Sequence, residues 1–416
     1  MKKEYQYFTT SRGLRIIYLN TNSNAEYCGV DVAVGSRNED TENFGIAHFI
    51  EHTIFKGTKK HTANYISNCM EQVGGELNAY TTKDETVVYS IFPKGNINRA
   101  VSLIADLIIN STFPDEQLDR ERDVVLDEID SYRDTPAEAI YDDFEEYLFE
   151  GTPMAHNILG NKNTIKTFDS VKCTTFLTEY YTASNMIFFY MGPTKPAKVL
   201  TTVEKYFADI SNTGLRGYDA ITNTFNTQPV NKVCNIESHQ SHTIIGTLLP
   251  GVSSKLRFPL ALLTNILGGP GMNARLNTIL REERGLVYTI EATTSFYNNC
   301  GTFTIYFGCD ADDSDKCKQL IFKEISKYTK TKLTKIQLDK AKRQYLGQLI
   351  VSGENREQLA LSAAHEYLVN VMSAKESTEP EHISSHLEEI NAITPDDIFQ
   401  AAQIISPERL SVLTYK

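Results

Sequence analysis

The sequence lacks closely spaced cysteines and long apolar runs. Its seven cysteines are odd in number and scattered, with no C-x-x-C pair, which argues against both a thiolate zinc site and a disulfide framework. Buried free thiols in a reducing compartment are therefore expected. No apolar stretch is long enough to cross a bilayer. The lysines near the N-terminus are not followed by an apolar run, so we expect no signal peptide and a cytoplasmic protein with no membrane association.

The chain also lacks the excess of basic residues that a nucleic-acid-binding protein needs. It has 41 lysines and arginines against 53 aspartates and glutamates, a net charge of −12 and a pI of about 5.3. Because phosphate backbones are bound through basic faces, these values argue against nucleic acid as a partner. With 416 residues, 41% of them hydrophobic, the chain is long enough for two globular domains.

Strand and helix patterns are mixed in both halves of the chain. Helical spacing of apolar residues marks 101–108 and a helix that begins near Pro114 and carries Leu118, Val125 and Ile129. Alternating or continuous apolar runs predict strands at 30–34, 86–91, 186–191, 232–236, 242–249, 302–307 and 410–413. This mixture predicts two homologous α+β domains, each a mainly antiparallel sheet packed with helices.

The apolar pattern fails between the two halves, where small and polar residues predict a linker at 212–231. This gives an N-terminal domain at 1–211 and a C-terminal domain at 232–416. The halves share a weak repeat, because Gln-Leu-Asp at 117–119 recurs at 337–339. If the repeat is real, the second half has a similar fold but binds no metal, since it contains no H-x-x-E-H pentapeptide.

The pentapeptide His-Phe-Ile-Glu-His at 48–52 carries the clearest chemistry. Residues four apart share a helix face, so His48 and His52 can bind one metal ion. Two neutral imidazoles suit zinc, and Glu51 lies beside the same opening, where a free carboxylate can take a proton from water. The order H-x-x-E-H is the inverted form of the H-E-x-x-H zinc-peptidase signature.

The pentapeptide alone leaves two interpretations open. A histidine pair on a helix is often only a polar surface, and a zinc site needs a third ligand from elsewhere. The acidic helix after Pro114 offers several carboxylates, but spacing does not separate Asp127 from Glu128. The other histidines are interpreted as structural or exposed, including His382 and His386, which have no glutamate at the matching place.

Five collinear blocks extend the pattern through both halves, at 45–58, 74–81, 121–128, 268–276 and 280–288. The first reads G-I-A-H-F-I-E-H-T-I-F-K-G-T, and the fourth reads G-G-P-G-M-N-A-R-L. Together they resemble the insulysin–pitrilysin family of zinc peptidases, the inverzincins, including the short bacterial relatives of mitochondrial processing peptidase. The resemblance implies a zinc-dependent metalloendopeptidase with one zinc ion per chain.

The resemblance supplies the missing ligand. It implies that Glu128 completes the zinc site with His48 and His52, and that Glu121 orients a ligand histidine. The family mechanism leaves one zinc position for water. Glu51 activates that zinc-bound water and passes the proton to the leaving amine.

The resemblance also implies residues that bind substrate. Arg281 and Tyr288 resemble an arginine–tyrosine pair that contacts the substrate carbonyl near the metal; the alternative is a charged helix end capped by glycine. Asn78, Ala79 and Tyr80 resemble the edge strand on which the family lays its substrate by backbone pairing. The alternative for these three residues is an ordinary strand after a glycine turn.

The resemblance further implies a partner. In the family's short members two chains form an enclosed chamber for unfolded peptides. Because this chain carries both the zinc motif and the arginine–tyrosine pair, we expect a homodimer. The alternatives are a non-catalytic core subunit, against which the intact H-x-x-E-H and Glu128 argue, and one half of a heterodimeric processing peptidase.

Overall fold

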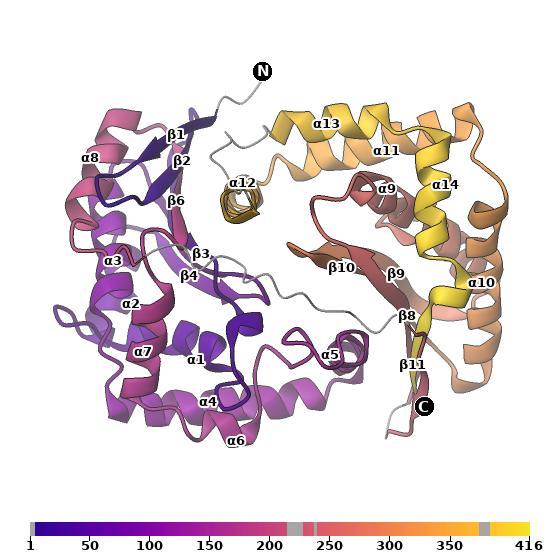
Figure 1. Cartoon of the computed structure of the whole chain (residues 1–416), viewed down its shortest axis with the longest axis horizontal. Helices are drawn as coiled ribbons and strands as arrows, with labels where there is room; N and C mark the ends of the chain where they lie inside the picture. Colours follow the sequence, from indigo (N-terminus) through magenta and orange to yellow (C-terminus); the bar gives the residue numbers. More distant parts are fainter. Residues whose placement is uncertain (1–4, 214–227, 237–238, 374–382) are drawn as a thin grey trace. The chain divides into compact units, whose positions relative to one another are not determined.

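The computed structural model describes residues 5–213, 228–236, 239–373 and 383–416 (Figure 1). These residues form two compact units, each with its own β-sheet and helices, so the predicted α+β class is confirmed. The centre of the linker expected at 212–231 lies outside the described residues. Within the described part, no helix combines the length and the apolar character needed to cross a membrane.

The first unit is built on a six-stranded sheet with the order β1-β2-β6-β3-β5-β4. Its strands are β1 (Tyr5–Thr9), β2 (Arg15–Asn20), β3 (Ala25–Val32), β4 (Glu76–Thr81), β5 (Thr86–Pro93) and β6 (Met186–Gly192). Neighbouring strands are antiparallel except for the parallel pair β2 and β6. Among the described strands, β4 pairs with β5 alone and so forms an edge of the sheet.

Helices from the N-terminal half cover one face of this sheet. They are α1 (Ile46–Thr53), α2 (Ala63–Glu71), α3 (Ile97–Asn110), α4 (Asp115–Arg133), α6 (Lys162–Ile165), α7 (Ser170–Tyr180) and α8 (Pro196–Tyr206). Side chains alternate between the faces of a strand, and those of β3 that enter this core are Cys28, Val30 and Val32. The buried residues of α4 are Leu118, Val125 and Ile129, the three predicted from the sequence.

The second unit is built on a five-stranded sheet with the order β7-β11-β8-β10-β9. Its strands are β7 (Asn231–Cys234), β8 (Ser241–Pro250), β9 (Val287–Phe296), β10 (Cys300–Cys309) and β11 (Ser411–Tyr415), antiparallel except for β7 and β11. Its helical elements from the C-terminal half are α9 (Arg257–Gly268), a π-helical turn (Asn277–Glu282), α10 (Ser314–Lys330), α11 (Lys335–Ser352), α13 (Ile383–Ala392) and α14 (Pro395–Ile404).

Each sheet takes one covering helix from the other half of the sequence. Helix α12 (Arg356–Ser373) lies on the first sheet beside β2, β3 and β6, where Ala364 and Leu368 share a core with Ile187 and Phe189 (Figure 1). Helix α5 (Pro136–Leu148) lies on the second sheet beside β8 and β11, where Ile140 and Phe144 share a core with Ile244 and Leu413. We call this arrangement the helix exchange.

The two halves follow the same order of elements. The run β3-α1-α2-β4-β5-α3-α4-α5 corresponds to β8-α9-π turn-β9-β10-α10-α11-α12. The repeated Gln-Leu-Asp falls near the start of α4 and of α11, and its leucines, Leu118 and Leu338, are both buried. Thus α5 and α12 are counterparts. The division predicted from the sequence, with domains at 1–211 and 232–416, assigns each of these helices to its own half. An apolar helix stripe does not specify which sheet the helix covers, so the sequence did not indicate the exchange.

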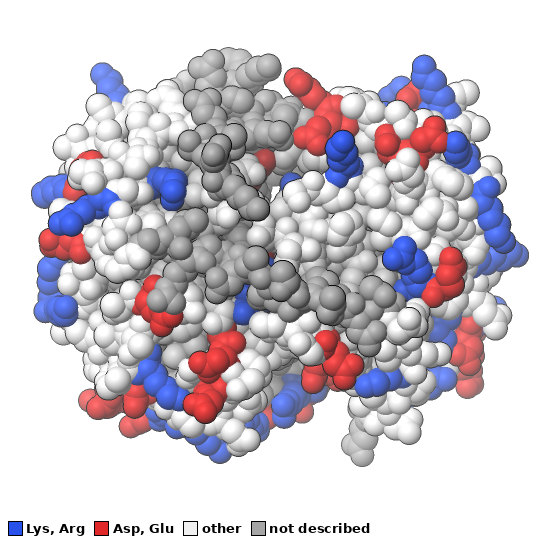
Figure 2. Space-filling model, in the orientation of Figure 1, with Lys and Arg blue, Asp and Glu red and all other residues white. Residues whose placement is uncertain are grey.

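The state of the cysteines and the distribution of surface charge agree with what the composition suggests. All seven cysteines are free, and all but Cys234 are buried. On the face shown in Figure 2, acidic and basic side chains are interspersed.

Candidate metal centre

Helix α1 presents its polar residues because its other side is anchored in the core. Ile46, Phe49 and Ile50 are buried in the core, whereas His48 and His52 approach Glu128 of α4 and Glu51 interacts electrostatically with the same carboxylate. Gly45 precedes the helix with φ of 95°, a left-handed conformation that favours glycine. A Cβ there would also meet the Leu159 carbonyl oxygen at 2.7 Å.

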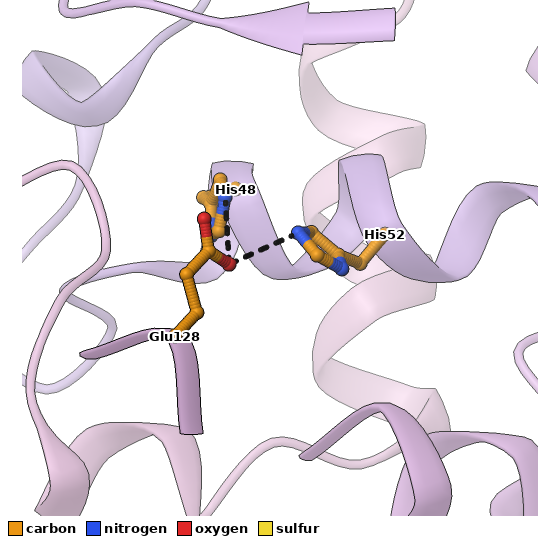
Figure 3. A group of neighbouring side chains, drawn as sticks. All are labelled: His48, His52 and Glu128. Atoms are coloured by element: carbon orange, nitrogen blue, oxygen red, sulfur yellow. Dashed lines mark ion pairs between the residues drawn. The ribbon is translucent and has the colours of Figure 1, made fainter. Parts of the chain in front are cut away.

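The two histidines converge with Glu128 of α4 (Figure 3). Glu128 Oε2 lies 3.4 Å from His52 Nε2 and 3.8 Å from His48 Nε2. One ligand atom from each residue lies within 4.8 Å of the others. Within the described residues, no other group of three histidine, cysteine or acidic side chains converges in this way.

The spacing and chemistry of the three residues fit a zinc ion. Two ligands bound about 2.0–2.2 Å from a tetrahedral ion lie about 3.3–3.6 Å apart, close to the two separations between Glu128 Oε2 and the histidines. Glu128 Oε2 is inaccessible to solvent and makes no hydrogen bond, although it faces both imidazoles. Because a buried carboxylate oxygen without a hydrogen bond is costly, this atom is suited to a cation. Asp127, which spacing could not separate from Glu128, is exposed and outside the cluster.

The surroundings favour the metal-binding protonation states of His48 and Glu128, whereas His52 is drawn toward its protonated form. Burial, aided by His52, lowers the pKa of His48 to about 4, which keeps its imidazole neutral. The interaction with His52 lowers the pKa of Glu128, and the same interaction raises the pKa of His52. A metal ion takes the place of the proton that this pair attracts, so binding releases protons.

Glu121 lies beside the other ring nitrogen of His52, on the side away from Glu128. Its Oε2 is 3.6 Å from His52 Nδ1, and its Oε1 is 2.7 Å from Lys56 Nζ. At 3.6 Å the carboxylate makes an ion-pair contact and no hydrogen bond, but its charge favours a proton on Nδ1, which leaves Nε2 free toward Glu128. Lys56, which holds Glu121 in place, was not identified from the sequence.

Glu51 lies next to the end of the edge strand. Burial raises the pKa of its carboxyl, and the neighbouring Thr81 of β4 acts in the opposite direction. Of the three predicted substrate-strand residues, Asn78 is exposed, Ala79 is half-buried, and Tyr80 is half-buried with its hydroxyl 3.4 Å from Glu85 Oε1. The structure thus brings Glu51 and β4 together.

Arg281 and Tyr288 belong to the second compact unit. Arg281 lies on the π-helical turn and is exposed. Gly285 follows that turn with φ of 61°, so the glycine cap considered as the alternative is present. Tyr288 on β9 is 54% exposed and donates to Asp310 Oδ1 at 2.7 Å. Their contact with substrate at the metal stays a prediction.

Two residues that support α1 escaped the sequence analysis. Glu39 accepts hydrogen bonds at the start of α1, and His156 contacts Glu39. The glycine before the helix was the available signal, because glycine has no side chain to cap the first amides.

Of the other histidines, His242 contacts Tyr306 and His365 contacts Glu85, while His382 lies outside the described residues.

Comparison with known proteins decides the family. The model of the insulinase family, peptidase family M16, matches residues 15–162, and the model of the peptidase M16 inactive domain matches residues 172–345. A zinc protease of Rickettsia felis is 30% identical over 373 residues, 89% of this chain and 87% of the relative. The chain belongs to peptidase family M16. The predicted resemblance is therefore confirmed.

Another relative and two solved structures match nearly the whole chain. The uncharacterized zinc protease YmxG of Bacillus subtilis is 28% identical over 388 residues, 93% of this chain and 94% of YmxG. A protease from Helicobacter pylori has the same fold, with a TM-score of 0.90, 20% identity and full coverage of both chains. An M16 inactive-domain protein from Pseudomonas fluorescens matches with a TM-score of 0.88, 17% identity, and 99% and 97% coverage.

Substitution of the predicted ligands should remove the metal. Because each contributes one of three protein donors, His52→Ala and Glu128→Gln should bind little zinc, while wild type should bind one ion per chain. Elemental analysis after gel filtration measures this directly. Asp127→Asn is the matched control, since it neutralises the exposed neighbour of Glu128 and should retain zinc. Full zinc content in both ligand variants would contradict the assignment.

Proposed function

We propose that this M16 family member is a zinc-dependent endopeptidase that hydrolyses unfolded peptides. The observation that carries the proposal is the convergence of His48, His52 and Glu128, with Glu51 beside them at the end of edge strand β4. The zinc-protease names of its curated relatives support the metal and the reaction class.

The chemistry needs one proton carrier, and Glu51 is placed to be it. A zinc ion held by His48, His52 and Glu128 supplies a Lewis acid that acidifies water and polarises a carbonyl. Glu51 lies outside the ligand set, so its carboxylate is free to take a proton from the attacking water. The same group then returns this proton to the departing amine.

The edge strand supplies a way to bind substrate without reading its sequence. Since β4 pairs with β5 alone among the described strands, its outer backbone groups can pair with an extended peptide. Arg281 can provide a guanidinium donor for the negative charge on the carbonyl oxygen in the transition state, and Tyr288 can provide a phenol donor once its hydroxyl leaves Asp310. Together these features favour an extended substrate over a particular side chain.

Cleavage of a mixed peptide library by the zinc-loaded protein tests the proposed activity. Mass spectrometry of the products should show internal cuts that stop when a chelator removes the metal and resume when zinc is restored. Intact peptides under all three conditions would overturn the proposal.

Selectivity should follow unfoldedness, because only an extended segment can add to an edge strand. We expect rapid cleavage of a small disulfide-containing protein after reduction and alkylation, and very slow cleavage of its native form. Time courses by mass spectrometry compare the two forms at identical sequence. Rapid cutting of the native protein at several sites is incompatible with this expectation.

A further inference from the structure

The start of α1 is capped from a distance. Gly45 occupies the cap position and has no side chain, so the first amides of the helix need an outside acceptor. Glu39 provides it: Oε2 accepts from the Gly45 N–H at 2.7 Å, and Oε1 accepts from the Ala47 N–H at 2.8 Å. A carboxylate at this end also interacts favourably with the helix dipole.

The Glu39 carboxylate is completely buried and takes its third bond from His156. Glu39 Oε2 lies 2.8 Å from His156 Nε2, which donates when Glu39 is ionised, since the oxygens of a carboxylate can only accept. The imidazole is stacked on Phe44, with ring centres 3.8 Å apart and planes 11° apart. The His156 carbonyl oxygen accepts from Lys83 Nζ at 3.0 Å, so its backbone is held as well.

We propose that Glu39 and His156 form a positioning pair that fixes the first turn of α1 and thereby holds His48 in place for the metal. The inference rests on the proposed zinc function. His48 directly follows Ala47, whose amide is bound by Glu39, whereas Glu128 is on a different helix. Any displacement of this turn therefore changes the separation of two ligands on separate elements.

His156 acts through the charge and orientation of Glu39, and never touches the metal cluster. Without the imidazole N–H, the buried carboxylate retains two amide donors, but its negative charge is less stabilised. It is then expected to rotate or to take up a proton. Either change weakens the cap at the turn that carries His48. A general contribution to folding would instead lower the stability of the unit without a selective effect on zinc.

Four variants separate these outcomes. Glu39→Gln places an amide where the site needs an acceptor, and His156→Phe keeps an aromatic ring on Phe44 but removes the donor. His156→Gln is the rescue, since its side-chain amide can donate in place of Nε2–H. Asp169→Ala is the matched control, because it removes the cap of α7, which carries no ligand.

Zinc affinity is measured by competition with a fluorescent chelator, alongside unfolding midpoints of the metal-free proteins. We expect Glu39→Gln and His156→Phe to bind zinc about 2- to 30-fold more weakly, the range for loss of a helix cap. His156→Gln should stay near wild type, and Asp169→Ala should keep its affinity despite lower stability. Wild-type affinity in folded His156→Phe, or equal loss in the phenylalanine and glutamine variants, overturns the inference.

Hydrogen exchange provides a readout that does not depend on zinc. In metal-free protein, the Gly45 and Ala47 amides should exchange faster in His156→Phe than in wild type or His156→Gln. Unchanged exchange would also overturn the inference. A wild-type protein that binds no zinc, but shows the expected exchange pattern, would reject the proposed function and leave the pair at the start of α1 established.

Discussion

Glu51→Gln should retain zinc and native stability while hydrolysing peptides roughly 10²–10⁴-fold more slowly than wild type, the usual contribution of a positioned proton carrier. Glutamine preserves the size and polarity of the side chain but cannot accept the water proton. The three metal-binding side chains are untouched, so zinc content should not change. Turnover of a fluorogenic peptide at saturating concentration gives the relevant kcat.

The control for this experiment is Glu42→Gln, which removes the same charge from an exposed position in the same compact unit. It should turn over at the wild-type rate. Near-normal kcat in Glu51→Gln would show that another group deprotonates the water. Loss of zinc in that variant would instead mean that Glu51 supports the metal, and kcat would then not report on proton transfer.

A mixture of two weakly active variants, Glu51→Gln and Tyr288→Phe, should recover about one quarter of wild-type activity. We propose a homodimer in which the metal cluster of one chain meets Arg281 and Tyr288 of the other, giving two equivalent sites. In a mixed dimer, one site then carries both substitutions and the other carries neither. Free exchange of equal amounts makes half of the dimers mixed, which gives the expected quarter.

The matched control mixes Glu51→Gln with Glu128→Gln. Both substitutions fall in the same half of the site, so every site keeps one of them and no activity should return. Mass spectrometry of isotope-labelled chains verifies that subunits exchange. If exchange is complete and the Tyr288→Phe mixture stays inactive, Tyr288 does not act across a dimer, and the shared-site proposal fails.

The sequence predicts those parts of the site that depend on local spacing. His48 and His52 are four residues apart on one helix, and that helix must turn its apolar residues inward, so their common face follows from periodicity alone. To choose Glu128 over Asp127, one must know which side of α4 faces the core. Val125 and Ile129 indicate that side from the sequence, but they do not identify a single carboxylate as the ligand.

The parts that the sequence does not predict depend on contacts between distant residues. Glu39 and His156 are 117 positions apart and share no periodic pattern. Nothing in the sequence distinguishes Lys56 from the other lysines and arginines, 41 in all; only its contact with Glu121 in the structure does. The helix exchange is hidden for a different reason, since the apolar stripes of α5 and α12 are equally compatible with the sheet of their own half.

The helix exchange sets the order in which this protein can be completed on the ribosome. When residue 211 has been synthesised, all six strands of the first sheet exist, but the helix that covers Ile17, Ile187 and Phe189 has not been made. That apolar face stays uncovered until α12, which ends at residue 373, has left the exit tunnel. The nascent N-terminal half therefore exposes this apolar face throughout translation of the second half, and exposed apolar surface makes a folding intermediate prone to aggregation. The half that carries the candidate metal centre finishes folding only after almost the entire chain has been made.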